Sequence, residues 1–462
     1  MVCPKLGRLA PLLCLLVGCS SADDPDSLVD AGPSGAGGSS DAGLDAPPNG
    51  AGGAGGAGGS GSGGAPGDEG PARYPNGALQ SPMSKSVVDG LRAVLAASSG
   101  RDAVFAKVGD SNTVNTNFLN CFDGPDLWLG EHAALEASRV FFGETLVDGT
   151  DSSYDRISLA AAVGWSAGNV IAGSPSALEQ EVQAITPAFA VVMLGTNETY
   201  AQGVEPFDKN LLTIVDRLLE LGVVPLLSTI PPRGDSAEAN DLVPEMNAVV
   251  RAIAQSRQVP LMDLWLPLHD LPEYGLAGDG IHLQVYVSGG AKGCWLTPEG
   301  LALGMNQRNL LTLEALDRAR RFLIEGEPPE ASPPPLAGAG TWRDPIVIDA
   351  LPFVDGRDTS QSLVSEADLY SCGAQDEGGP EVVYRVVLDA PTTLRARVFD
   401  ADSVDVDLQW LSGPSGAECV ARGDKVLDVT AEAGTYWLTA DSFVSGGAAL
   451  AGAYRLTLVA LP

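Results

Sequence analysis

A mostly apolar run that stops at a polar turn constrains the fold of this chain more than any other feature. Residues 103–108 are rich in apolar and β-branched side chains, and Gly109, Asp110 and Ser111 follow them directly. Such a run, cut short by small turn-forming residues, indicates a buried strand that ends in a tight turn. The sequence therefore predicts that Ser111 lies at the carboxyl end of a sheet, where open α/β sheets hold their ligands.

Two later segments carry polar groups in comparable settings. The apolar run 190–194 leads into Gly195-Thr196-Asn197, which predicts a second strand end with an amide at its tip. Asp279 and His282 stand three residues apart in a third polar segment. A serine hydroxyl becomes a useful nucleophile only beside a general base. These segments could therefore supply a base and hydrogen-bond donors for Ser111.

In this order and at this wide spacing, the motifs around Ser111, Asn197 and His282 resemble the GDSL or SGNH hydrolase family of esterases and lipases. The resemblance covers roughly residues 80–325, about half of the chain. One tripeptide alone is weak evidence because small turn residues cluster by chance, whereas three motifs in order give a stronger signal. The resemblance implies a serine hydrolase on a three-layer α/β/α sandwich.

The resemblance also implies a role for each side chain. Ser111 would be the nucleophile and His282 the base that takes its proton. Asp279 would orient His282 and stabilise its protonated form, or a backbone carbonyl would share that task. The side-chain amide of Asn197 and the N–H of Ser111 would bind the oxyanion. Leu283 follows His282 where many relatives carry proline.

The remaining oxyanion donor of the family is a glycine N–H after the second strand. The candidate segment is 163–169, in which Ala167 interrupts the Ser-Gly pair that is common in relatives. Gly164 or Gly168 could fill the role, and so could Ala167, because only a backbone group is required.

Each motif also has a simpler interpretation. Ser111 could cap a helix, Asn197 could form a turn, and Asp279 with its following glycine could be no more than a turn. His132 and His269 lack a comparable context, and the few histidines show no paired metal-ligand spacing. The sequence therefore predicts neither a catalytic metal nor another cofactor.

Alternation of helix faces and apolar runs predicts an α/β domain over residues 73–325. An apolar face at 87–95 precedes the Ser111 strand, and a second face at 207–219 precedes an apolar run at 223–230. Alternating strands and helices favour a parallel sheet that is covered on both faces. A long last helix is expected over 298–323, with Thr297 as its N-cap and Pro298 at its first position.

Residues 1–19 predict an export signal. Lys5 and Arg8 precede an apolar core at 9–17 that is too short to span a bilayer. The segment that ends at Cys19 resembles a bacterial lipobox, which implies cleavage before Cys19 and a lipid on its sulfur and amine. A plain secretory signal with an incidental cysteine is the alternative.

Residues 20–72 are almost entirely Gly, Ala, Ser, Asp and Pro up to about residue 70. This composition predicts a flexible tether with a span of about 40 Å. An anchor and tether would hold the folded part away from a bacterial membrane. Ser20 after Cys19 favours the outer membrane or cell surface.

The charge balance limits the partners. Acidic residues outnumber basic ones by 59 to 27, for a formal net charge of −32. Nucleic acid and anionic lipid surfaces are therefore not expected as partners. We expect a monomer whose membrane contact is made through the lipid anchor alone.

Cysteine positions fit an exported protein. Two of the seven cysteines leave with the signal and Cys19 takes lipid, so two remain in each folded half. This distribution predicts one disulfide per half, Cys121 with Cys294 and Cys372 with Cys419. The first bridge would join the segments that follow the nucleophile and the histidine.

The pattern changes after a Pro-rich linker at residues 326–341. Short alternating runs separated by turns fill 342–462 and predict an all-β sandwich domain. Several segments resemble the prepeptidase C-terminal domains of secreted bacterial enzymes. Binding of a glycan or wall polymer and a passive spacer are both open as roles.

An acidic stretch in this half could hold calcium. Its members lack the ordered spacing of a known calcium loop, so the sequence favours a solvated acidic turn. The residues are Asp400, Asp402, Asp405 and Asp407.

Together these features predict an exported, lipid-anchored serine esterase. The ester substrate could be an O-acetylated polysaccharide, a lipid ester or a small ester, with the polysaccharide favoured. A non-catalytic surface binding protein on a hydrolase scaffold is one alternative. A lipase or thioesterase is another.

Overall fold

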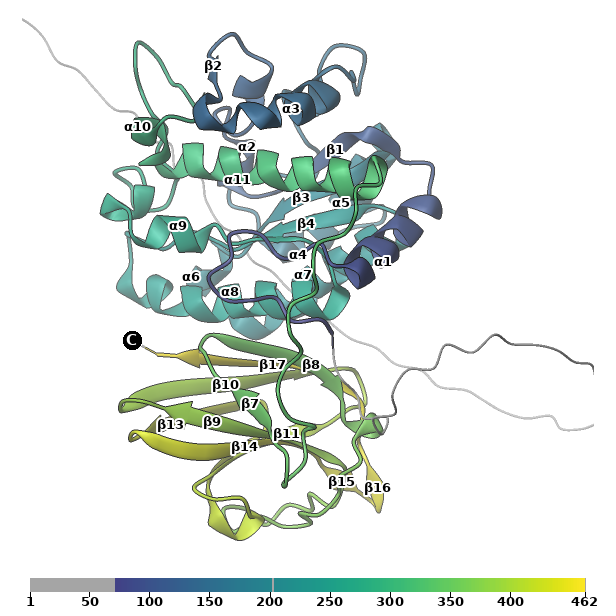
Figure 1. Cartoon of the computed structure of the whole chain (residues 1–462), viewed down its shortest axis with the longest axis vertical. Helices are drawn as coiled ribbons and strands as arrows, with labels where there is room; N and C mark the ends of the chain where they lie inside the picture. The colour runs from purple at the N-terminus through teal and green to yellow at the C-terminus, as the bar shows by residue number, and fades with distance from the viewer. Residues whose placement is uncertain (1–70, 202, 462) are drawn as a thin grey trace, which may run out of the picture. The chain divides into compact units, whose positions relative to one another are not determined.

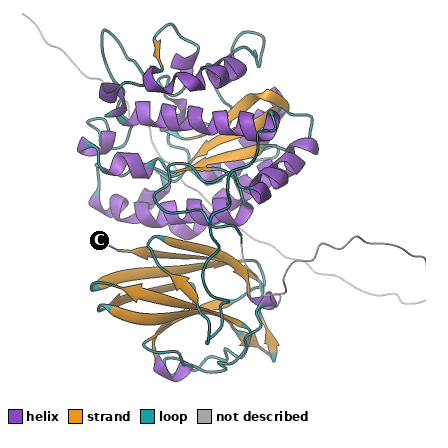
Figure 2. Cartoon of the chain, in the orientation of Figure 1, coloured by secondary structure: helices purple, strands orange, loops and turns teal. Residues whose placement is uncertain are grey.

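The computed structural model describes residues 71–201 and 203–461, which belong to one compact unit (Figure 1). An α/β region comes first and a β-rich region follows it (Figure 2). The predicted export signal, the lipidated Cys19 and the tether up to residue 70 lie outside the described residues. The domain boundaries expected at 325/326 and 341/342 stay predictions.

A parallel sheet forms the centre of the α/β region, as the alternating pattern predicts. Its strands lie in chain order: β1 (Arg101–Gly109), β3 (Pro187–Met193), β4 (Val224–Ser228) and β5 (Leu261–Met262). Every residue of β3 and β4 is buried, which explains why these strands read as unbroken apolar runs.

Helices cover the sheet on both sides, and Figure 1 shows α11 on one side and α8 on the other. The helices are α1 (Lys85–Ala96), α2 (Ser111–Val114), α3 (Glu136–Gly143), α4 (Ala167–Ile171), α5 (Ala177–Ile185), α6 (Glu198–Ala201), α7 (Val204–Glu220), α8 (Ala237–Arg257), α9 (Trp265–His269), α10 (Pro298–Leu301) and α11 (Gly304–Ala319). Val87 and Leu91 of α1, and Phe207 and Leu218 of α7, are buried as the periodicity predicts. None of the helices in the described ranges is both long and apolar enough to cross a bilayer.

The single long helix expected over 298–323 is wrong, because the chain breaks between α10 and α11. Thr297 is the N-cap, as predicted, and its side chain accepts from the N–H of Gly300. Leu303 then adopts an extended conformation, and the N–H of Met305 donates to the carbonyl of Gln284. This tertiary contact ends the first helix, and a π-helical turn over Arg320–Ile324 follows α11.

The β-rich region is a sandwich of two mainly antiparallel sheets. One sheet has the order β13 (Val426–Ala431), β10 (Thr392–Asp400), β17 (Ala453–Ala460), β8 (Phe353–Asp358). The other has the order β12 (Cys419–Gly423), β11 (Val406–Leu411), β14 (Gly434–Ser442), β9 (Glu381–Leu388), β7 (Ile346–Ile348), with β7 parallel to β9. Alternate residues such as Leu408, Leu438 and Tyr384 fill the core between the sheets.

Two further sheets have two strands each. β2 (Leu127–Trp128) pairs with β6 (Cys294–Trp295), and β15 (Val444–Ser445) pairs with β16 (Ala448–Ala449). The first ladder brings the chain near Cys121 toward the chain that follows His282, because Cys294 lies in β6.

Charged pairs join α7 and α8 to the sandwich. The buried carboxylate of Glu245 accepts from Arg395 at 2.7 Å and from Arg397 at 2.6 Å. Arg455 of β17 donates to Asp208 at 2.6 Å. Because Glu245 is 3% exposed and holds two arginines, removal of either partner would leave a buried charge poorly compensated.

Candidate active site

The turn after β1 presents Ser111. The carboxylate of Asp110 accepts from the N–H of Asn112 at 2.9 Å and caps α2, so Ser111 is the first residue of that helix. Gly109 is required just before the turn, since a Cβ there would lie 2.1 Å from the hydroxyl of Thr113. Ser111 therefore lies where the sequence predicts, directly after the carboxyl end of a strand of the parallel sheet.

A tight loop brings Asp279 and His282 together. One oxygen of Asp279 accepts from the N–H groups of Ile281 and His282, each at 3.0 Å. Its other oxygen lies 2.7 Å from Nδ1 of His282. Gly280 has φ +70°, and a Cβ there would lie 2.6 Å from the backbone of Gly234, so the loop needs a glycine.

The loop aims His282 at Ser111. Nε2 of His282 lies 2.9 Å from Oγ of Ser111, although 171 residues separate the two in the chain. Ser111, His282 and Asp279 thus form one hydrogen-bonded series, which is the geometry that general-base activation requires.

Asp279 is held in its ionised form. Partial burial raises its pKa, but the hydrogen bonds from His282 and Ile281 outweigh burial and bring the pKa to about 2. An anionic carboxylate at Nδ1 fixes the tautomer in which Nε2 accepts the serine proton.

Register in the sheet gathers the candidate oxyanion groups beside Ser111. Gly109 pairs with Met193 of β3 on one side and with Ala161 on the other. Asn197 follows β3, and its side-chain amide donates to the carbonyl of Trp165 at 2.8 Å. The predicted amide and the predicted glycine segment are therefore in direct contact.

Among the three candidate backbone donors, the N–H groups differ in their partners. The N–H of Ala167 donates to Glu198 at 2.5 Å. Gly164 is in a turn with φ +77°, and Gly168 is the second residue of α4. Because the N–H of Ala167 already has a partner in Glu198, Gly164 and Gly168 remain the two candidates, and these contacts do not distinguish between them.

Glu198 is a buried carboxylate that the sequence motifs do not single out. It is fully buried directly after Asn197. Burial raises the pKa of Glu198 to about 7, and the nearby Asp110 adds to the shift, while the N–H of Ala167 opposes it. No local sequence pattern identifies it, because its neighbours Thr196, Asn197 and Thr199 are polar as in a surface loop.

Arg308 contacts the turn that carries Ser111. Its guanidinium donates to the carbonyl of Asn112 at 2.8 Å and to the hydroxyl of Thr113 at 2.9 Å, and it stacks 3.6 Å from the ring centroid of Phe118. Burial lowers the pKa of Arg308 to about 9, so the side chain stays charged at neutral pH. The charge lies opposite the buried Asp110.

The other two histidines have partners of their own. Nδ1 of His132 lies 3.9 Å from Glu314, and the ring of His269 stacks on Trp265 with a centroid distance of 4.5 Å.

The predicted disulfides are present. Cys121 bonds to Cys294 and Cys372 bonds to Cys419. The first of them joins the segment that follows Ser111 to the segment that follows His282.

Comparison with known proteins agrees with this arrangement. Residues 108–285 match the model of the GDSL-like Lipase/Acylhydrolase family. No curated protein matches the chain.

Similar solved structures include a GDSL-like lipase from Bacteroides thetaiotaomicron VPI-5482, with 13% identity, coverage of 50% of this chain and 99% of that chain, and a TM-score of 0.31. Another is an acetylxylan esterase from Geobacillus stearothermophilus, with 15% identity, coverage of 47% and 95%, and a TM-score of 0.32. A third is an acylhydrolase described from Bacteroides fragilis NCTC 9343, with 14% identity, coverage of 49% and 93%, and a TM-score of 0.30. Residues 108–285 are thus similar to the GDSL-like Lipase/Acylhydrolase family.

Proposed function

We propose that this protein is an exported, lipid-anchored serine hydrolase that cleaves carboxylic esters through Ser111, His282 and Asp279. The observation that carries the proposal is the series from Asp279 to His282 to Ser111, with distances of 2.7 and 2.9 Å. His282 would take the proton of Ser111 as its oxygen attacks the ester carbonyl, and would return it to the leaving alcohol.

The oxyanion of the tetrahedral intermediate would bind to three donors: Asn197, the N–H of Ser111 and the N–H of Gly164 or Gly168. Asn197 contacts the Gly168 segment through Trp165, which supports a shared pocket. Water would then hydrolyse the acyl-enzyme with His282 again as the base.

An acylated polysaccharide is the substrate that we favour. The side chains of His282 and Asp279 are 37% and 49% exposed, so an attached acyl group on a large polymer could reach them. A deep, enclosed site would instead favour a small ester.

A lipase or thioesterase is the second candidate. Val163 lies at the start of the oxyanion segment and is 75% exposed, which offers apolar surface to a longer acyl chain. A non-catalytic binding protein is disfavoured, because such a protein would not need an aligned base and nucleophile.

Export and anchoring are part of the proposal. The two disulfides support export, since such bonds persist in oxidising compartments. Metabolic labelling with a palmitate analogue should mark the protein and should fail with Cys19→Ser.

Turnover of p-nitrophenyl acetate, butyrate and octanoate, together with acetate release from acetylated xylan, tests the function. Preference for acetate and release of acetate from the polymer would support the polysaccharide esterase. A preference for octanoate would support the lipase. No turnover of any ester by folded protein would contradict the proposed function.

A further inference from the structure

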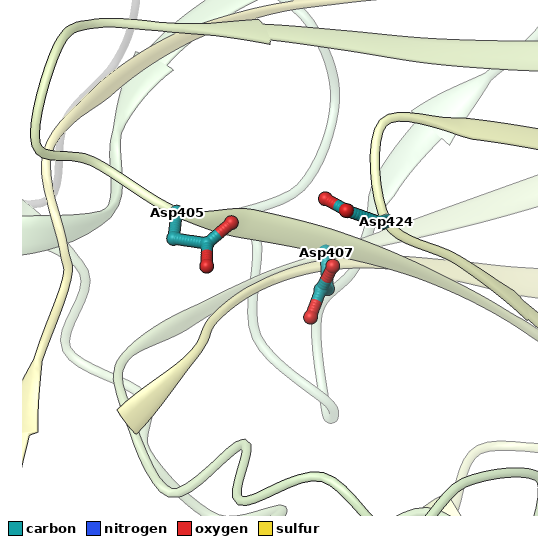
Figure 3. A group of neighbouring side chains, drawn as sticks. All are labelled: Asp405, Asp407 and Asp424. Carbon is teal, nitrogen blue, oxygen red and sulfur yellow. The ribbon is translucent and has the colours of Figure 1, made fainter. Parts of the chain in front are cut away.

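Three carboxylates meet at one end of the sandwich, on β11 and the hairpin beside it. One ligand oxygen from each of Asp405, Asp407 and Asp424 lies within 4.8 Å of the others, and Figure 3 shows the three side chains. Asp405 and Asp407 flank the first residue of β11, and Asp424 follows Gly423, which pairs with Leu408. The strand register therefore creates the cluster.

Asp407 differs from an ordinary surface acid. Its side chain is 3% exposed, so the solvated turn favoured by the sequence does not describe this residue. One of its oxygens accepts from Arg422, whereas Oδ1 is buried without a hydrogen-bond partner among the described residues. A buried carboxylate oxygen that lacks a partner is costly, so it indicates a missing ligand.

Glu377 shows the same pattern beside Asp407. It is 2% exposed, its Oε1 accepts from Nε of Arg422 at 3.1 Å, and its Oε2 has no partner in the described chain. The two carboxylates are adjacent and share one guanidinium. A single guanidinium thus serves two buried carboxyl groups.

The acidic row continues across the sheet. Asp407 lies directly opposite Asp441 on β14, and Asp441 lies directly opposite Glu381 on β9. Like charges in opposite cross-strand positions are destabilising unless something neutralises them. Asp441 and Glu381 also each keep one buried oxygen without a partner within the described residues.

Lys425 forms ion pairs with the less buried acids around Asp407. Its ammonium contacts Asp400 at 2.6 Å, Asp405 at 2.7 Å and Asp424 at 3.4 Å. Within the described residues Lys425 forms no ion pair with Asp407 or Glu377, so the buried oxygens remain available.

Geometry distinguishes a metal ion from a shared proton. A proton can bridge only two oxygens, whereas ligands about 2.4 Å from one Ca²⁺ lie at most about 4.8 Å apart. Three carboxylates within that distance, all oxygen donors, match a hard cation with flexible coordination better than Zn²⁺ or Mg²⁺.

We propose that Asp405, Asp407 and Asp424, with Glu377 beside them, form a calcium-binding site in the β-sandwich. The ion would bind the free oxygen of Asp407 and fix the β12–β13 turn, which carries Asp424, onto β11. An affinity of about 10⁻⁴ to 10⁻³ M is expected, as for other extracellular calcium modules.

Calorimetric titration of the EGTA-treated full chain with CaCl₂, paired with thermal unfolding, tests the site. Wild type should bind one Ca²⁺ saturably and gain several degrees in Tm at 10 mM CaCl₂, with a much smaller effect of MgCl₂. Asp407→Asn and Asp424→Asn should weaken binding at least tenfold. Asp402→Asn is the matched control, because Asp402 is an exposed acid of the same stretch and should bind like wild type.

Asp424 is exposed, so Asp424→Asn should fold even if Asp407→Asn does not. Absence of saturable binding and of a Tm shift in wild type would overturn the site. So would a calcium-dependent shift of equal size in wild type and Asp424→Asn. If Asp407→Asn simply raises Tm with no calcium dependence in either protein, a shared proton is the correct account.

Discussion

The side-chain oxygen of Asn112 accepts a hydrogen bond from the N–H of Leu283 at 3.0 Å. This bond links the residue after Ser111 to the residue after His282. A proline at position 283, as in many similar hydrolases, has no N–H and could not make it. The change at Leu283 thus adds a direct link between the two catalytic loops.

The Cys121–Cys294 bond is a second link between the same loops, so its loss should affect both stability and turnover. It closes a loop of 173 residues, for which the chain-entropy model gives a stabilisation of about 5 kcal/mol before any strain. Thermal unfolding should show a large drop in Tm for Cys121→Ser with Cys294→Ser, and kcat should fall. The matched pair Cys372→Ser with Cys419→Ser should lower stability and leave kcat unchanged. Equal kcat values for the two double variants would contradict the prediction that the Cys121–Cys294 bond supports turnover.

Asn197→Ala should lower kcat by about 10²- to 10³-fold with little change in KM, because an oxyanion donor acts mainly in the transition state. Steady-state kinetics with p-nitrophenyl acetate measure this. Asn197→Asp places a negative charge at the same position and should be slower still. An unchanged kcat in Asn197→Ala would exclude Asn197 from the oxyanion hole.

Asp279→Asn should keep the fold and lose activity. The amide cannot stabilise the protonated imidazole and favours the wrong tautomer of His282, so a loss of about 10²- to 10⁴-fold in kcat is expected. Asp270→Asn removes an exposed acid outside the triad and serves as the control. If both variants retain wild-type kcat, a backbone carbonyl orients His282 instead.

Glu198→Gln should change how stability depends on pH. The folded pKa of Glu198 is about 7 and its ordinary value is 4.5, so the folded state holds the proton more tightly. This contribution to stability is complete below pH 4.5 and is lost as pH rises through 7, a change of at most about 3 kcal/mol.

Tm measured between pH 5 and 8 should therefore fall more in wild type than in Glu198→Gln, whose amide oxygen can still accept from Ala167. Glu205→Gln, at an exposed acid, should behave like wild type. Parallel Tm curves for wild type and Glu198→Gln would show that Glu198 is ionised throughout.

The sequence predicts that Ser111, His282 and Asp279 come together because each lies in a short local motif after a strand or in a loop, and the structure places their side chains in contact. The parallel sheet and the main helix faces are also predictable, since buried runs such as 187–193 and the periodic face of α7 depend on local composition. The sandwich strands over 381–388 and 434–442 are visible for the same reason.

Tertiary contacts account for what the sequence does not reveal. The last helix breaks at Leu303, where Gly304 packs against Gly275. A Cβ at Gly304 would lie 2.6 Å from the carbonyl oxygen of Gly275. Glu198 and Arg308 act on the site from positions that only folding brings near Ser111. The sequence predicts that Asp407 is an exposed acid, but its side chain is buried because of the register of β11.

Labelling with a fluorophosphonate, read by intact mass, tests the central claim most directly. A fluorophosphonate modifies only an activated serine hydroxyl, so wild type should gain one adduct that peptide mapping places on Ser111, with loss of esterase activity. Ser111→Ala should remain unlabelled and inactive. An adduct on another serine, or no adduct on folded wild type, would contradict the assignment of Ser111 and His282 as nucleophile and base.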